Sequence, residues 1–461
     1  MPARKARAAK TGLPSIAERL AAGKSLRRKC PRAALARFEP GTGRNVVRWI
    51  QASNKGRIER LIPIRSGRML HSAFAFLRGA AAVMANDIGR LPSPAIRTQL
   101  CGDCHLANFG GFASPERALQ FGINDFDETL PGPFEWDVKR LAASFAVAAR
   151  SQGLPRRDGL DAAHAVARSY REHMAQFARM HALELWYTSI EVNTLVQLAR
   201  SAQTRRLRRQ MVDKARQHTM DHLFPALTEV KGGLPRFADH PPLIYHPTHI
   251  PDFEQDTHAF WRHYVETLPE ERRPLIDRYR LVDVAIKVVG VGSVGTRCAI
   301  ALLLAGAGDP LVLQFKEARR SVLEPYAGAS RHANQGLRVV IGQRLMQTAS
   351  DIFLGFSHAP HLKEDFYVRQ LRDMKVSLEL EHLSAQDFLE YAEACGWELA
   401  RAHGKAGDAA LISGYLGKSD AFDRAIGSFA LAYADQTERD HAALQAAVKA
   451  GRLHAQIEPD R

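Results

Sequence analysis

The chain has 461 residues, of which 46% are hydrophobic and 25% are charged, a composition typical of folded globular proteins rather than disordered ones. No apolar run approaches the ~20 residues of a membrane-spanning helix. The basic N-terminus lacks the apolar segment of a secretory signal. Five cysteines are too few, and odd in number, for a disulfide framework. We therefore expect a cytoplasmic protein without a membrane span, large enough for two or three domains.

The net charge of +15 is concentrated at the N-terminus. Residues 1–60 contain 16 lysines and arginines against three glutamates, which leaves the other 401 residues near +2. One helix is expected here, around Ser15–Ala22. Such a basic arm suits an anionic partner, namely nucleic acid, a membrane surface or an acidic protein, or else it is a solvated tail. Phe38 and Trp49 are its only aromatic residues, so base stacking has little support.

Two polar loops follow an Ala-rich segment, residues 69–90, that is expected to form one buried helix. A short strand over 96–100 leads into Cys-Gly-Asp-Cys-His-Leu-Ala-Asn, which ends at Asn108. A second strand over 119–124 leads into Asn-Asp-Phe-Asp, which ends at Asp127. Both loops therefore lie at strand ends, where catalytic side chains are often displayed.

Phosphoryl transfer needs the residue types that these loops contain. One carboxylate orients the attacking hydroxyl, while an amide oxygen and a second carboxylate hold Mg²⁺. Asp103, Asn108, Asp125 and Asp127 supply these groups. The pattern resembles the catalytic and metal-binding loops of aminoglycoside and choline kinase-like phosphotransferases. The alternative is that these residues only cap turns or form a solvated acidic turn.

A glycine-rich loop, Gly-Val-Gly-Ser-Val-Gly over 290–295, has two interpretations. In a dinucleotide-binding unit, Thr296–Ala305 is a helix and Glu317 binds the ribose. In a kinase-like hairpin, the same segment is a strand, and a third strand carries Lys316 to the phosphates. We favour the hairpin because it also accounts for the cluster at Asp103 and for a lysine in an apolar strand.

The resemblance to kinase-like proteins implies a role for each matching residue. Asp103 would be the catalytic base and His105 would brace its loop. Asn108 and Asp125 would bind Mg²⁺, with Asp127 as a second candidate ligand. The residues that would bind the nucleotide, ATP, are Gly290, Gly292, Ser293, Gly295, Lys316 and, as ion-pair partner of the lysine, Glu324.

Further residues are expected to support the site. By the same resemblance, Asp137 would hydrogen-bond to the catalytic loop and stiffen it. Three arginines, Arg65, Arg68 and Arg78, are candidate contacts for an anionic substrate or else form salt bridges. Cys101 stands where the relatives usually carry histidine. With Cys104 it forms a C-x-x-C motif, which is redox-active, half of a zinc site with His105, or simply a pair of small buried residues.

The order of these motifs predicts a circularly permuted fold. In kinase-like proteins the glycine loop and its lysine precede the catalytic loop, whereas here they follow it. We expect an α+β, protein-kinase-like fold with two lobes, a mostly helical large lobe and a small antiparallel β lobe. The predicted segments are a basic arm (1–60), a catalytic and metal-loop helical lobe (61–280), a β lobe that covers the nucleotide (281–376), and helices that complete the large lobe (377–461).

Segments spread over nearly the whole chain resemble an uncharacterised bacterial family, domain of unknown function 2252. They include residues 63–69, 74–80, 100–111, 124–133 and 288–297. This resemblance implies no activity, so the expected function comes from the loops: transfer from ATP, with Mg²⁺, to an unknown hydroxyl-bearing acceptor. Nucleotidyl transfer would use the same metal site. The alternatives are an NAD(P)-binding oxidoreductase, an inactive kinase-like protein and a nucleic-acid-binding module.

Overall fold

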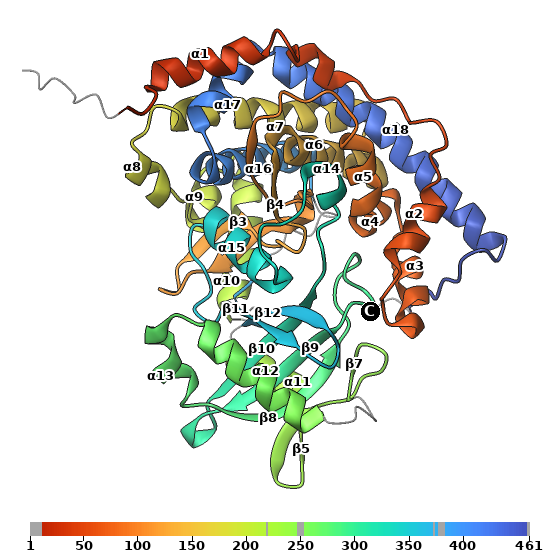
Figure 1. Cartoon of the computed structure of the whole chain (residues 1–461), viewed down its shortest axis with the longest axis vertical. Coiled ribbons are helices and arrows are strands. Elements are labelled where there is room, and N and C mark those ends of the chain that lie inside the picture. The colour runs from red at the N-terminus through yellow and green to blue at the C-terminus, as the bar shows by residue number, and fades with distance from the viewer. Residues whose placement is uncertain (1–11, 218–219, 247–252, 372–373, 377–382, 459–461) are drawn as a thin grey trace, which may run out of the picture.

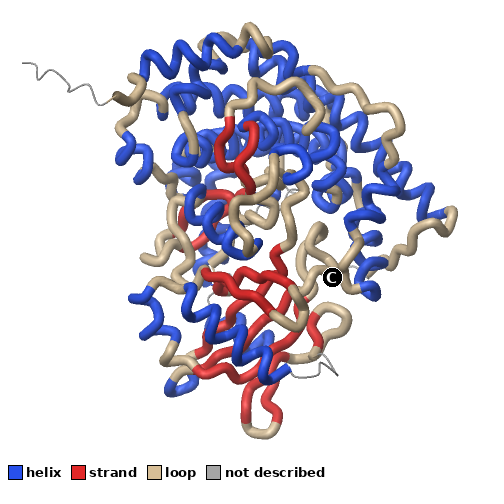
Figure 2. The backbone as a smooth tube through the Cα atoms, in the orientation of Figure 1, coloured by secondary structure: helices blue, strands red, loops and turns tan. Residues whose placement is uncertain are grey.

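A computed structural model of the chain describes residues 12–217, 220–246, 253–371, 374–376 and 383–458. Most of the helices gather at one end of the molecule, and the largest sheet, of six strands, lies at the other (Figures 1 and 2). The protein is therefore a mixed α+β protein with antiparallel sheets, as predicted. No helix among the described residues has the length and apolar character needed to cross a membrane.

The six-stranded sheet is entirely antiparallel, in the order β11-β12-β10-β9-β8-β7. Its strands are β7 (Ile244–Tyr245), β8 (Arg280–Lys287), β9 (Cys298–Leu304), β10 (Pro310–Ala318), β11 (Gly355–Ala359) and β12 (Glu364–Gln370). Ala301 and Leu303 of β9 face a core shared with helix α12 (Phe253–Thr267), whereas Ile300 and Leu302 face a core shared with Phe237. Burial on both faces explains the continuous apolar run of β9.

The helical end is built around α6 (Phe134–Ser151), which is buried along nearly its whole length. It packs against α7 (Arg156–Phe177) and α18 (Ala421–Lys449), and α7 in turn packs against α16 (Ala385–Ala406) and α17 (Ala409–Leu416). Alanines line these contacts, including Ala142, Ala146 and Ala163, and allow the helices to approach closely. This bundle supports the loop after β1, which carries Asp103, through Asp137 of α6.

Short elements connect the bundle to the sheet. The segment 69–90 forms α3 (Ile62–Leu70), α4 (Ala73–Gly79) and α5 (Ala81–Ile88), so the prediction of one continuous helix is wrong. Ser72 caps α4 by accepting a hydrogen bond from the amide of Ala75, which starts a new helix there. Further helices and strands are α8 (Ala182–Tyr187), α9 (Val192–Gln197), α10 (Ala202–Gln217), α11 (Met220–Leu227), α13 (Arg273–Ile276), α14 (Glu324–Ala327), α15 (Gln335–Met346), β1 (Arg97–Leu100), β2 (Phe109–Ala113), β3 (Leu119–Ile123), β4 (Leu130–Pro133), β5 (Thr228–Lys231) and β6 (Leu234–Phe237).

The basic N-terminal segment is folded onto the helical end from residue 12 onward. Helix α1 (Ile16–Leu26), with a capping box at Ser15, packs on α17, and α2 (Val46–Ser53) packs on α5 and α18. Arg27 donates to the Tyr415 carbonyl, and Arg44 forms ion pairs with Asp87 and Asp440. The expectation of a solvated tail is therefore wrong for residues 12–60, because many of its cations have partners inside the chain.

A buried carboxyl on α6 makes stability depend on pH. Glu135 is 1% exposed, and burial raises its pKa to about 7 from an ordinary value of 4.5. Burial lowers the pKa of the neighbouring Lys139 to about 8, so this ammonium stays protonated below pH 7. A carboxyl whose pKa is higher in the folded than in the unfolded state contributes stability when the pH is below its unfolded-state pKa. That contribution is lost as the pH rises through its folded-state pKa.

We expect Glu135→Gln to remove this pH dependence. Between pH 4.5 and 7 the free energy of unfolding of the wild type should fall by about 2 to 3 kcal/mol relative to the variant. Urea unfolding at several pH values measures this difference. The same change at the exposed Glu39 is the control and should give a flat difference. A flat difference for Glu135→Gln as well would contradict the prediction.

Candidate active site

The loop after β1 carries Asp103 and is held by a carboxylate from α6. Asp137 accepts hydrogen bonds from the backbone amides of Cys101 and Gly102, at 2.8 and 3.1 Å, which is the contact expected of it. His403 of α16 lies 3.2 Å from the same carboxylate. Gly102 has φ of +87°, and a Cβ there would meet the Glu128 carbonyl at 2.2 Å, so only glycine fits.

Asp103 is fixed by an ion pair that the sequence did not indicate. Arg140 of α6 donates through Nε to Asp103 Oδ1 at 2.6 Å, and its Nη2 contacts the same oxygen. Burial raises the pKa of Asp103, and Arg140 opposes this effect. His105 Nε2 lies 3.9 Å from Asp103 Oδ2. Burial, followed by the charges of Arg78 and Arg140, holds the pKa of His105 well below its usual value, so this buried histidine is neutral at pH 7.

A tight hairpin brings the second loop to the first. Strands β2 and β3 pair from Phe109 opposite Ile123, so Asn108 and Asn124 face each other directly beyond the paired residues. The amide of Asn124 donates to the Asn108 carbonyl at 2.7 Å, and Asn108 Nδ2 donates to the Asp103 carbonyl at 2.7 Å. Asp125 therefore follows immediately after the contact between the loops. This register explains why residues 17 positions apart in the sequence meet in one site.

Lys316 reaches the same site from β10. Its Nζ lies 2.8 and 3.0 Å from the two carboxylate oxygens of Asp127 and 4.0 Å from Asp125 Oδ1. Tyr367 of β12 also donates to Asp127, at 2.5 Å. Burial alone would lower the pKa of Lys316, but the two carboxylates raise it above its ordinary value. Lys316 is therefore a buried cation with acidic partners.

The predicted pairing of Lys316 with Glu324 is wrong. Glu324 begins α14, which packs on β4 rather than on the sheet. Its charge acts on Arg338 instead. The physical reason is that the chain turns away after β10, whereas the loop that carries Asp127 lies directly beside Lys316. Because Asp127 is bound to Lys316, Tyr367 and, at 3.4 Å, Ser293, it is also the less suitable of the two candidate acidic metal ligands.

The glycine loop connects two antiparallel strands. Residues 298–304 form β9, which pairs with β8 on one side and β10 on the other, so the hairpin interpretation of this segment is confirmed. Gly290 and Gly295 have φ of +67° and +86°. Arg57 Nη1 donates to the Val294 carbonyl at 2.6 Å and braces the loop. Glu317, the ribose-binding candidate of the dinucleotide interpretation, accepts from the Arg297 amide at 2.8 Å.

These elements enclose a polar cleft of about 130 Å³. The predicted residues that line it are Asp103, His105, Asn108, Asp125, Asp127, Gly290, Gly292, Ser293, Arg65 and Arg78. Lys316 does not line the cleft itself but contacts Asp127, which does. Asp137 accepts a hydrogen bond from the loop that carries Asp103. Three other lining residues, Arg57, Glu128 and Arg319, were not predicted as site residues, and Glu317, which also lines the cleft, was a candidate only in the dinucleotide interpretation. Charged residues are frequent in the sequence, and only the tertiary structure shows which of them line the same cleft.

The three predicted anion contacts differ in their surroundings. Arg65 is 2% exposed and donates to Asn54 Oδ1 and to the Gly79 carbonyl. Arg68 forms an ion pair with Glu458 at 2.6 Å and contacts the Gly290 carbonyl. The salt-bridge alternative therefore holds for Arg68, whereas Arg65 lines the cleft and donates to an amide oxygen and a backbone carbonyl rather than to a carboxylate. Arg78 lines the cleft without such partners.

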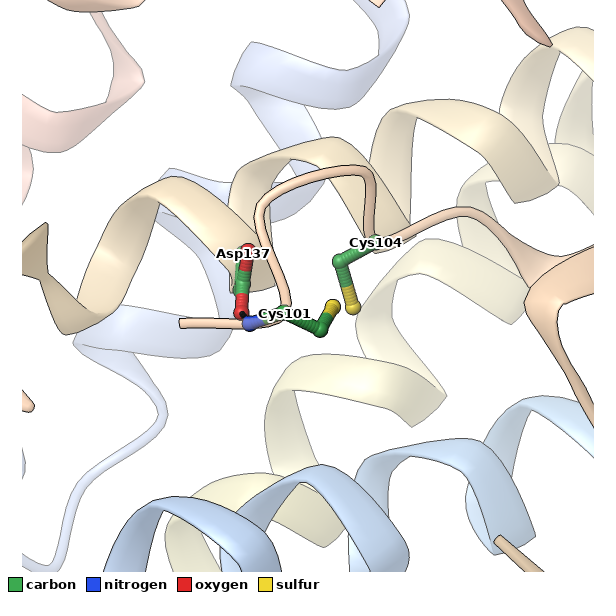
Figure 3. Close-up of side chains that lie close together, drawn as sticks. All are labelled: Cys101, Cys104 and Asp137. Atoms are coloured by element: carbon green, nitrogen blue, oxygen red, sulfur yellow. Dashed lines mark hydrogen bonds between the residues drawn. The ribbon is translucent and has the colours of Figure 1, made fainter. Parts of the chain in front are cut away.

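The two cysteines that flank Asp103 lie next to Asp137 (Figure 3). In the described part of the chain, Cys101, Cys104 and Asp137 are a group of metal-ligand residues whose ligand atoms lie within 4.8 Å of one another. Both thiols are fully buried, and burial raises the pKa of each, so they are protonated at neutral pH. The carboxylate is already bonded to two amides. The group therefore fits the interpretation as small buried residues better than a zinc or redox centre.

A larger cavity of about 270 Å³ lies elsewhere, between α10, α16 and β2. Its walls are mainly apolar side chains such as Phe121, Leu195 and Val376. It contains none of the predicted site residues. The polar cleft is therefore the candidate active site, because it alone of the two contains the acids, glycines and cations that the sequence singled out.

The fold and the cleft together define a mixed α+β protein in which loops of a helical bundle and a glycine hairpin of an antiparallel sheet enclose one charged site. The chain belongs to the family described as "Uncharacterized protein conserved in bacteria (DUF2252)", whose model matches residues 57–447. That match spans both loops, the hairpin and most of the bundle. The comparisons with curated proteins and with solved structures gave no match.

Proposed function

We propose that the protein is a Mg²⁺-dependent phosphotransferase that uses ATP and a hydroxyl-bearing acceptor. One observation carries the proposal: a buried lysine on the third strand of a glycine hairpin contacts the acidic loop that adjoins Asp103 and Asn108. Kinase-like catalysis depends on such a combination of lysine, glycine loop and acidic loops. The fold would then be a permuted kinase-like fold, because the hairpin follows the catalytic loop in the chain.

The side chains fit the metal that this reaction uses. Asn108 donates through Nδ2 to the Asp103 carbonyl, which fixes its amide and leaves Oδ1 to act as a ligand. Asp125 lines the same cleft with a side chain that is 34% exposed. Asn108 and Asp125 would hold Mg²⁺, a cation that prefers oxygen ligands. When bound, Mg²⁺ neutralises charge on the phosphates.

Side chains and backbone of the protein would orient the acceptor and bind the phosphates. Arg140 holds Asp103 Oδ1, so Oδ2 is the oxygen that would orient the acceptor hydroxyl and take its proton. Lys316 would bind phosphate oxygens in exchange for part of its contact with Asp127. Gly290 and Gly292 would allow the backbone to approach the phosphates, because no side chain separates them. The dinucleotide alternative needs a helix after this loop, whereas the chain forms strand β9 there.

A ligand-binding measurement tests the proposal. We expect Mg²⁺-ATP to raise the thermal unfolding midpoint of the wild type, since ligand at about 100 times its dissociation constant adds ~2.7 kcal/mol of stability. The increase should depend on Mg²⁺ and should be lost in Asp125→Ala. Asp309→Ala, in the exposed turn before β10, is the matched control and should keep it. NAD(P)H is the control ligand, and a shift with NAD(P)H alone would contradict the proposal.

A further inference from the structure

Arg78 is a cation of the cleft whose guanidinium has no hydrogen bond or ion pair among the described residues. Its Nε is buried without a partner, and its Cζ lies 5.9 Å from the centre of the Phe74 ring. Arg78 lines the same cleft as Asp103 and Asp125, and these two carboxylates oppose the effect of burial, which lowers the pKa of Arg78. A desolvated cation without a hydrogen-bond partner is unfavourable unless an anion binds it.

The backbone around Arg78 is held on both sides by other arginines. Arg140, which also binds Asp103, donates through Nη2 to the Leu77 carbonyl at 3.0 Å. Arg65 donates through Nη2 to the Gly79 carbonyl at 2.7 Å. The backbone at Arg78 is therefore held relative to Asp103 before any ligand binds, and such preorganisation of the backbone favours stabilisation of developing charge.

The same residue touches the glycine loop. A Cβ added at Gly292 would lie 3.2 Å from the Arg78 carbonyl, so helix α4 and the loop are in close contact. Arg78 thus lies where the glycine loop, Asp103 and Asp125 meet. In a phosphotransferase, the phosphate being transferred occupies the space between the glycine loop and the catalytic acid.

We propose that Arg78 binds the terminal phosphate of ATP and stabilises its transfer. This inference rests on the proposed function. During transfer, the bond from the terminal phosphorus to the bridging oxygen breaks and ADP leaves. A bond to the acceptor oxygen forms, and the acceptor proton passes to Asp103. Arg78 would donate hydrogen bonds to the phosphate oxygens throughout and would exchange no proton.

Two nucleotides that differ in this phosphate provide the test. Isothermal titration of the wild type with Mg²⁺-ADP and with the non-hydrolysable ATP analogue AMP-PNP should show about 10- to 100-fold tighter binding of the analogue, the worth of charge-assisted hydrogen bonds. Arg78→Gln should abolish this preference and leave the affinity for Mg²⁺-ADP unchanged. Arg78→Lys should restore it only in part, because a lysine does not bind phosphate in a bidentate manner. Arg206→Gln, on the exposed face of α10, is the matched control and should keep the preference.

Each other outcome overturns a defined statement. If Arg78→Gln keeps the preference for AMP-PNP, the inference is wrong while the proposed function stands. If Arg78→Gln weakens both nucleotides equally and lowers the unfolding midpoint without nucleotide, Arg78 is structural. If the wild type binds neither nucleotide, the proposed function fails and this inference fails with it.

Discussion

Replacing Asp103 by asparagine is expected to lower the rate of ADP release from Mg²⁺-ATP by about 10²- to 10⁴-fold, the usual contribution of a catalytic acid or base. The affinity for Mg²⁺-ATP should stay unchanged, because the proposed role of Asp103 concerns the acceptor and not the nucleotide. Asparagine has the same shape and keeps an oxygen for Arg140, so the loop should keep its position. Steady-state kinetics together with titration of the nucleotide separates the two quantities.

The control for this experiment is Asp309→Asn. Asp309 accepts a hydrogen bond from Tyr279 in the turn before β10 and is not among the residues that line the cleft. It should leave both the rate and the nucleotide affinity unchanged. A full rate in Asp103→Asn would show that Asp103 is not the catalytic base. An equal loss of rate and of nucleotide affinity would instead place Asp103 in the nucleotide site.

The parts of the site that the sequence predicted are local in the chain. Asp103 and Asn108 belong to one loop, and the short hairpin of β2 and β3 determines where Asp125 lies relative to them. The glycine hairpin was predictable for a similar reason. Its loop and strands are consecutive, and a lysine at position 316 in an apolar strand demands an acidic partner. Sequence patterns are informative when neighbours in the chain are also neighbours in space.

The parts that the sequence did not predict depend on contacts between distant segments. Arg140 and Asp103 are 37 residues apart, and Lys316 and Asp127 are 189 apart. The prediction for Glu324 came from the kinase-like pattern and failed because the partner of Lys316 is Asp127, on a loop that lies far from it in the sequence. The prediction of a solvated N-terminal tail failed for a similar reason. Composition does not distinguish Arg44, which pairs with two aspartates, from a solvated cation.

The loop that carries Asp103 is expected to contribute to the stability of the fold, because the buried Asp137 holds its backbone. Asp137 is 1% exposed and accepts hydrogen bonds from two backbone amides, while His403, in contact with it, lies 2.9 Å from the hydroxyl of Tyr170. We expect Asp137→Ala to lower the free energy of unfolding by about 3 to 5 kcal/mol, since it leaves these buried donors without an acceptor. This is a large fraction of the stability of an ordinary domain.

A graded series distinguishes loss of these hydrogen bonds from loss of volume. Ser144→Ala removes a single hydrogen bond to the same loop, from the Leu106 amide at 3.0 Å, and should lower the free energy of unfolding by only about 1 kcal/mol. Asp137→Asn keeps the volume but offers one acceptor oxygen to two amides, so it should fall between Ser144→Ala and Asp137→Ala. Urea unfolding gives all three values. If Asp137→Asn is as stable as the wild type, the carboxylate is not what holds the loop, because the amide alone would then suffice.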